Sequence, residues 1–165
     1  MSELQGTLQF SEAALRQAEV IFQRYPHDRR ESAVMPLLHL AQREFGGWLP
    51  REALDYVAGL VGMAPIRVYE VATFYTMYNL KPVGQYHVQV CTNIACWLCA
   101  SDGIVRALQE KLRLPLGGSS TDGRFTLSEV ECLGACVNAP MMQINDDYYE
   151  NLTPARVAEI IDQLP

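Results

Sequence analysis

Long apolar runs and excess positive charge are both missing from this chain of 165 residues. No stretch approaches the roughly 18 apolar residues of a membrane-spanning helix, so we expect no direct membrane insertion. Lysine and arginine number 13 against 19 acidic residues, which leaves no basic face and predicts no nucleic-acid partner. With 19% charged and 49% hydrophobic residues, the chain is not typical of a disordered protein and has ample material for a folded core.

Recognisable signals for export or nucleotide binding are missing as well. The first six residues lack the basic segment and apolar stretch of a secretory signal, and they do not resemble an arginine-rich transit peptide. We therefore expect a soluble, cytoplasmic protein. No G-x-G-x-x-G fingerprint occurs, so we expect no nucleotide site and no independent active site. In a reducing cytoplasm, the five cysteines are expected to be metal ligands or redox groups.

The period of the hydrophobic pattern changes near residue 81. Before it, apolar residues recur at helical spacing in four short segments that are separated by short loops. This pattern predicts a helical bundle as an N-terminal domain over 1–80. The sequence Lys81-Pro-Val-Gly84 interrupts the helical pattern, and we take it as the boundary to a second domain over 81–165.

The second domain mixes strands and helices. Alternating patterns predict strands over 86–90 and 124–130, and a hairpin turned at 145–147 follows. Helices are predicted after Ser101 or Asp102, as possible caps, and after Thr153-Pro154. A crossover unit followed by a hairpin predicts a mixed sheet with helices packed on it. The predicted fold class is α+β.

Every cysteine lies in this second domain, and two of them stand at predicted strand ends. Cys91 ends the first strand and Cys132 ends the second. If these strands are parallel neighbours, their carboxyl ends share one edge of the sheet, where sites commonly form. The loops Cys91–Cys96 and Cys132–Cys136 would then face each other and form a four-thiolate site.

The cysteine spacing alone leaves several chemistries open. Cys-x4-Cys and Cys-x3-Cys lie at the long edge of the zinc pattern, whereas the wider loops suit a 2Fe–2S cluster. A plant-type ferredoxin would use Cys91, Cys96 and Cys99 with one later cysteine. The Cys96-x-x-Cys99 form is also that of a thiol oxidoreductase, which would leave three cysteines idle. We interpret Cys99 as a packed side chain rather than a ligand.

Longer motifs around these cysteines resemble the 24 kDa (E) subunit family of respiratory complex I, NADH:quinone oxidoreductase. They are Cys91-Thr-Asn-Ile-Ala-Cys96 and the run from Phe125 through Cys132-Leu-Gly-Ala-Cys136 to Asn145. The resemblance continues upstream in Gly46-Gly-Trp-Leu-Pro50 and Val68-Tyr-Glu-Val-Ala-Thr-Phe-Tyr75. It covers nearly the whole chain after residue 10.

The resemblance implies more than the spacing can. It implies a thioredoxin-like 2Fe–2S ferredoxin domain after a helical bundle, with Cys91, Cys96, Cys132 and Cys136 as cluster ligands and Cys99 outside the set. It implies an electron-carrying subunit of an oxidoreductase, beside the flavin of a flavoprotein partner that binds FMN and NADH. Further complex I subunits would hold this pair at the cytoplasmic face of the inner membrane. Within this family, the missing transit peptide leads us to expect a bacterial protein rather than a mitochondrial one. Equivalent subunits of NAD-linked hydrogenases and formate dehydrogenases are the alternative, and a structural zinc module is the alternative from another class.

Two remaining features bear on the partner. Four aromatic residues near the end of the helical half fit either a partner surface or the core: Trp48, Phe74, Tyr75 and Tyr78. The charge is uneven, because residues 91–165 carry a net charge of −5 whereas residues 1–90 carry −1. We expect docking to rest mainly on apolar contacts from residues 45–80, and the acidic surroundings to lower the cluster's reduction potential.

Overall fold

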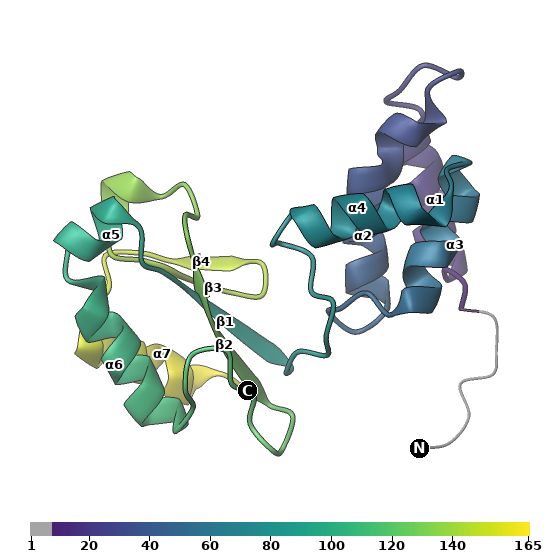
Figure 1. The fold of residues 1–165 in the computed structure, drawn as a ribbon. Coiled ribbons are helices and arrows are strands. Elements are labelled where there is room, and N and C mark those ends of the chain that lie inside the picture. The colour runs from purple at the N-terminus through teal and green to yellow at the C-terminus, as the bar shows by residue number, and fades with distance from the viewer. Residues whose placement is uncertain (1–7) are drawn as a thin grey trace. The chain divides into compact units, whose positions relative to one another are not determined.

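The computed structural model describes residues 8–165 and divides into two compact units between Pro82 and Val83 (Figure 1). The first unit is helical, and the second unit holds a four-stranded sheet. Each unit buries a hydrophobic cluster of its own, so each is described by itself.

Four α-helices and one 3-10 turn, η1, build the described part of the first unit. Their bounds are α1 Glu12–Phe22, η1 Arg30–Ala33, α2 Val34–Glu44, α3 Arg51–Val61 and α4 Pro65–Phe74. Ser11 caps α1 by accepting a hydrogen bond from the Ala14 N–H at 3.2 Å. Gly62 ends α3 in the left-handed conformation, and Pro65 opens α4. These local signals explain why the predicted helices form where they do.

The four aromatic residues near the end of the helical half differ in how far they are exposed. Tyr78 is 4% exposed and donates a hydrogen bond from Oη to the Met35 carbonyl at 3.0 Å, so it belongs to the core. Phe74 is 77% exposed and Tyr75 is 39% exposed. Trp48 is half-buried. Only Phe74 and Tyr75 therefore remain as large exposed aromatic surface in this group.

The second unit is built on a sheet of order β2-β1-β3-β4. Its strands are β1 Tyr86–Cys91, β2 Phe125–Val130, β3 Met142–Ile144 and β4 Asp147–Tyr149. β1 pairs with β2 in parallel, whereas β3 pairs antiparallel with both β1 and β4. The mixed sheet, the hairpin and the parallel pairing are confirmed. Cys91 stands opposite Val130 at the carboxyl ends of the parallel pair.

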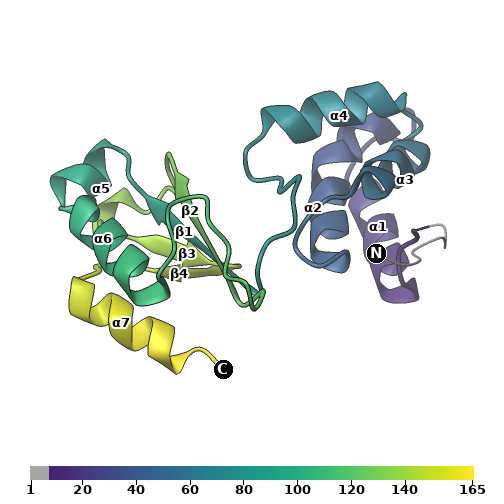
Figure 2. The ribbon, with the colours of Figure 1, turned by 60° about the horizontal axis from the view of Figure 1, so that its bottom comes forward.

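Helices α6 Ser101–Leu112 and α7 Pro154–Gln163 lie side by side and pack with the sheet (Figure 2). Their shared core takes alternate strand residues, including Val88, Val90 and Leu127. Neither Ser101 nor Asp102 caps α6, so that expectation is wrong: the cap residue is Ala100, with φ 62°, and Ser101 is fully buried in the first turn. Among residues 8–165, no single helix is long and apolar enough to cross a membrane, although the bent pair α3 and α4 passes that test together by length and composition.

Candidate metal centre

The cysteine loops leave the sheet at the carboxyl ends of β1 and β2. Cys91 is the last residue of β1, and its N–H donates to the Met141 carbonyl at 3.2 Å. β2 ends at Val130, so the expectation that Cys132 ends this strand is wrong. The Thr92 N–H still donates to the Val130 carbonyl at 3.2 Å, and the chain leaves the ladder after this bond. Cys132 is thereby carried by a loop.

The first loop folds into a short helix that the sequence pattern does not reveal. Asn93 begins α5 Ile94–Leu98 by accepting a hydrogen bond on Oδ1 from the Ile94 N–H at 2.7 Å. Cys96 lies inside this helix and is 1% exposed. Cys99 follows at the end of α5 and is exposed, so the expectation of a packed Cys99 is wrong. The loop therefore buries one of its cysteines and exposes another.

The second loop brings its two cysteines close together through a left-handed glycine. Gly134 has φ +80°, a conformation that side chains rarely adopt, and its N–H donates to Cys132 Sγ at 3.3 Å. Cys136 begins the 3-10 turn η2 Cys136–Asn138. The peptide bond Ala139-Pro140 is cis, and the chain then enters β3. Cys132 and Cys136 are exposed, whereas Cys91 and Cys96 are buried.

Interactions between the thiols join the two loops into one cluster. The pKa of Cys96 is raised to about 11, mainly by burial and next by a hydrogen bond with the Cys91 thiol. Negative charge on Cys91 or Cys136 also raises the pKa of Cys96. The pKa of Cys136 is also raised, chiefly by a hydrogen bond with the Cys132 thiol and by repulsion from its charge, with a further contribution from Cys91. Cys96 and Cys136 therefore resist ionisation, each beside another thiol, and bound cationic iron would favour their deprotonated forms.

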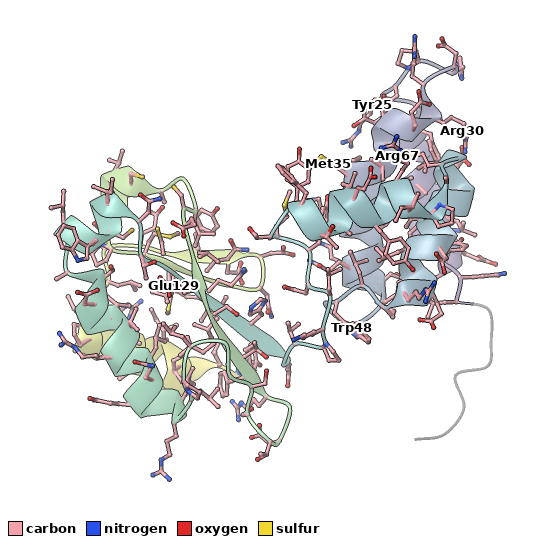
Figure 3. All side chains as sticks on the ribbon, viewed as in Figure 1. Tyr25, Arg30, Met35, Trp48, Arg67 and Glu129 are labelled. Carbon is pink, nitrogen blue, oxygen red and sulfur yellow. The ribbon has the colours of Figure 1, made fainter. Side chains whose placement is uncertain are left out.

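Two side-chain contacts tie the ends of β1 and β2 beside these thiols. Cys91 Sγ donates to the Glu131 carbonyl at 3.5 Å. Thr92 Oγ1 donates to Glu129 Oε1 at 2.7 Å; Glu129 is labelled in Figure 3. Each bond links the loop that follows β1 to the segment that leads into Cys132. The geometry therefore favours a single site over two separate loops.

The surroundings of the thiols fit a 2Fe–2S cluster. Cys91, Cys96 and Met141 form a buried group of their own, and these apolar residues pack against it: Val130, Leu133, Ala135 and Ala139. Such a cluster takes four thiolate ligands, two on each iron. The two loops offer four thiols, of which Cys91 and Cys96 are buried among apolar residues. Within residues 8–165, no group of three or more His, Cys, Asp or Glu side chains has the arrangement that holds one metal ion.

The geometry also bears on the two alternatives that use Cys99. An attacking thiol needs a lowered pKa and access to its substrate, yet Cys96 is buried with a raised pKa. This disfavours a thiol oxidoreductase built on Cys96 and Cys99. The interactions that join the thiols involve Cys91, Cys96, Cys132 and Cys136, which favours this set over the plant-type set with Cys99.

Comparisons with known proteins agree with this description. The family model of thioredoxin-like 2Fe–2S ferredoxins matches residues 18–165. The E subunit of NADH-quinone oxidoreductase from Rickettsia conorii is 56% identical over 155 residues, which cover 94% of this chain and 93% of that protein. NADH dehydrogenase (ubiquinone) flavoprotein 2, mitochondrial, of Dictyostelium discoideum is 49% identical over 155 residues, 94% of this chain and 63% of that protein.

A solved structure supports the fold independently of close sequence similarity. The crystal structure of NAD+-reducing NiFe hydrogenase in the H2-reduced state matches with a TM-score of 0.68 and 20% identity, over 80% of this chain and 23% of that chain. At this identity the likeness shows the fold alone, which confirms the predicted thioredoxin-like α+β class. The family resemblance drawn from the sequence is confirmed as well. The chain belongs to the thioredoxin-like 2Fe–2S ferredoxin family.

Proposed function

We propose that the chain is the electron-carrying subunit of an NADH:quinone oxidoreductase, with a 2Fe–2S cluster held by Cys91, Cys96, Cys132 and Cys136. The observation that carries this proposal is the convergence of these four thiols from two loops at one sheet edge. The 56% identity to the Rickettsia conorii protein over 94% of the chain supports the choice of parent complex. We also propose that residues 1–80 and 81–165 act as separate domains, of which the second holds the cluster.

The chain's own residues position and shield the cluster, while the bound cluster supplies one-electron chemistry. The thiols of Cys91 and Cys96 are buried, which protects them from solvent and oxidants. Cys132 and Cys136 close the site from the exposed side. The Gly134 N–H, which donates to Cys132 Sγ, stabilises negative charge on that sulfur.

Serine substitutions test the ligand set directly. The wild-type chain, loaded anaerobically with iron and sulfide, should be reddish-brown, hold two irons per chain and become paramagnetic on reduction. Cys99→Ser is the matched control and should keep the cluster, whereas serine at any of the four proposed ligands should lose or badly perturb it. Loss in Cys99→Ser with retention in Cys136→Ser would establish the plant-type set, and a colourless protein with bound zinc would establish a structural zinc module.

The electron donor in this proposal is a flavoprotein subunit that binds FMN and NADH. Near the proposed ligands, α5 exposes Ile94 at 71%, Trp97 at 57% and Leu98 at 72%, and Val137 is 97% exposed. In the first unit, Phe74 and Tyr75 are exposed large apolar side chains. Exposed apolar and aromatic side chains of this kind are typical of the centres of protein interfaces, where a partner shields them from water. We infer that these two surfaces meet the flavoprotein.

The partner surface can be tested with two double variants. Phe74→Ala with Tyr75→Ala should weaken co-purification with the flavoprotein subunit and leave the cluster spectrum unchanged. Trp48 is left out of this pair because it is half-buried and its removal would disturb the fold. Leu15→Ala with Val20→Ala, on exposed apolar positions of α1, is the matched control. Equal association of both folded double variants would overturn the assignment of this surface.

Within the assembled complex, we propose a position at the cytoplasmic face of a bacterial inner membrane, attached through the flavoprotein and further complex I subunits. The chain then exchanges electrons with the flavin and does not itself bind NADH. Mild salt washing of membranes tests this placement. The chain should leave the membrane together with the flavoprotein subunit, and release of the chain alone would contradict the proposed attachment.

A further inference from the structure

The second cysteine loop has little burial to hold it in place. Cys132 and Cys136 are exposed, and Val137 between the loop and β3 is 97% exposed. A loop with few buried apolar contacts opens at low free-energy cost unless hydrogen bonds hold it. Residues 131–138 therefore depend on hydrogen bonds to stay closed over the site.

The end of the hairpin supplies three hydrogen bonds to this loop. Tyr148 Oη donates to the Leu133 carbonyl at 2.7 Å. Asn138 Nδ2 donates to Glu150 Oε2 at 2.8 Å, and the Asn151 N–H donates to the Asn138 carbonyl at 2.8 Å. Tyr148 therefore holds the loop beside Cys132, and Glu150 and Asn151 hold it just after Cys136.

The strand register explains why Tyr148 faces this loop. Tyr149 packs against the core beneath the helices, so its neighbour Tyr148 points to the opposite face of β4. Tyr148 is paired with Gln143, which is paired with Gln89 across the sheet. Cys91 lies two residues beyond Gln89 and thus on the same face. The Tyr148 hydroxyl reaches the second cysteine loop over the face that carries the first cysteine.

We propose that Tyr148 is a positioning residue for the cluster: its hydroxyl fixes the Leu133 peptide between Cys132 and Gly134 and keeps the second loop closed. The inference rests on the proposed function, because it takes Cys132 and Cys136 as ligands. Loop opening would carry these two sulfurs away from the buried Cys91 and Cys96, so the hydroxyl slows the loss of iron. The same peptide group carries the Leu133 carbonyl and the Gly134 N–H, so the hydrogen bond from Tyr148 also orients the donor to Cys132 Sγ.

The test compares Tyr148→Phe with Tyr149→Phe in the full chain loaded with iron and sulfide. Both variants lose one hydroxyl from adjacent positions of β4, but only Tyr148 holds the cysteine loop. With excess iron chelator, Tyr148→Phe should lose its visible absorption about fivefold faster than wild type, the factor expected for one net hydrogen bond. Its reduced-state paramagnetic signal should also shift, whereas Tyr149→Phe should match wild type in both measurements.

A second variant and a folding control keep the inference separate from the proposed function. Glu150→Ala cuts the tie to Asn138, leaves Tyr148 intact and should also accelerate iron loss. Thermal unfolding of the metal-free variants should remain close to wild type, which excludes a general loss of stability. Equal release rates in cluster-loaded wild type, Tyr148→Phe and Tyr149→Phe would overturn this inference alone. A wild-type chain that binds no cluster would overturn the proposed function, and the inference with it.

Discussion

Removing the negative charge of Glu131 should raise the reduction potential of the cluster. Glu131 directly precedes Cys132 and is exposed, and its backbone carbonyl accepts the hydrogen bond from Cys91 Sγ. Two unit charges about 8 Å apart interact by about 2 kcal/mol at an effective dielectric constant near 20, and by about 0.5 kcal/mol in water. Because about 59 mV is a tenfold change for one electron, these limits correspond to about 90 and 20 mV. Because Glu131 is exposed, we expect the rise in reduction potential in Glu131→Gln to lie near the lower of these two values.

Redox titration followed by paramagnetic resonance measures this shift at two ionic strengths. The Debye length is about 30 Å at 0.01 M and about 3 Å at 1 M, so the rise in potential should be clear at low salt and nearly absent at high salt. Glu110→Gln is the control, because this exposed carboxylate lies about 14 Å along α6 from the start of that helix. A potential that is unchanged or lower in Glu131→Gln at low salt would refute the electrostatic reasoning and leave burial and hydrogen bonds as the determinants.

The remaining predictions concern the second unit. In urea titration, Gly84→Ala should lower the free energy of unfolding by more than about 2 kcal/mol, because the new Cβ would stand 2.6 Å from the Phe125 carbonyl carbon. Gly103→Ala is the control: it lies in α6 with open space around it and should raise the free energy of unfolding by about 0.5–1 kcal/mol. Burial holds the pKa of His87 below its ordinary 6.5, so the unfolded state binds the proton more readily than the folded state. The free energy of unfolding should therefore fall below pH 6.5, by at most about 1.4 kcal/mol per pH unit. This part of the fall should vanish in His87→Gln, and an equal fall in that variant would contradict the role of His87.

Much of the fold could be predicted because its signals are local. Ser11 and Thr153 cap helices with their own side chains, and prolines open α4 and α7. The hairpin turn at Asn145 has φ 55°, the left-handed conformation that the predicted turn requires. In each case, residues within a few positions of one another determine the element, so a pattern in the sequence is sufficient.

The errors arose where distant contacts override such signals. Ser101 is a good capping residue by type, yet packing draws it fully into the core and Ala100 takes the cap position instead. Tyr78 is no error, because the sequence left it open between core and surface. Its hydroxyl donates to the Met35 carbonyl, 43 positions earlier, and only this distant contact decides for the core. The short helix α5 has only five residues, too few for a hydrophobic period to become visible.

The candidate site divides in the same way between local and distant determinants. The cysteine spacing and the parallel strands could be predicted, and together they bring the two loops to one sheet edge. The residues that hold those loops could not be predicted: Thr92 meets Glu129, 37 positions later, and Tyr148 meets Leu133, 15 positions earlier. None of these four residues is of the thiolate type that ligates iron–sulfur clusters, so no motif marks them. Because the second pair of thiols is exposed, such hydrogen bonds take the place of burial in keeping that half of the site closed.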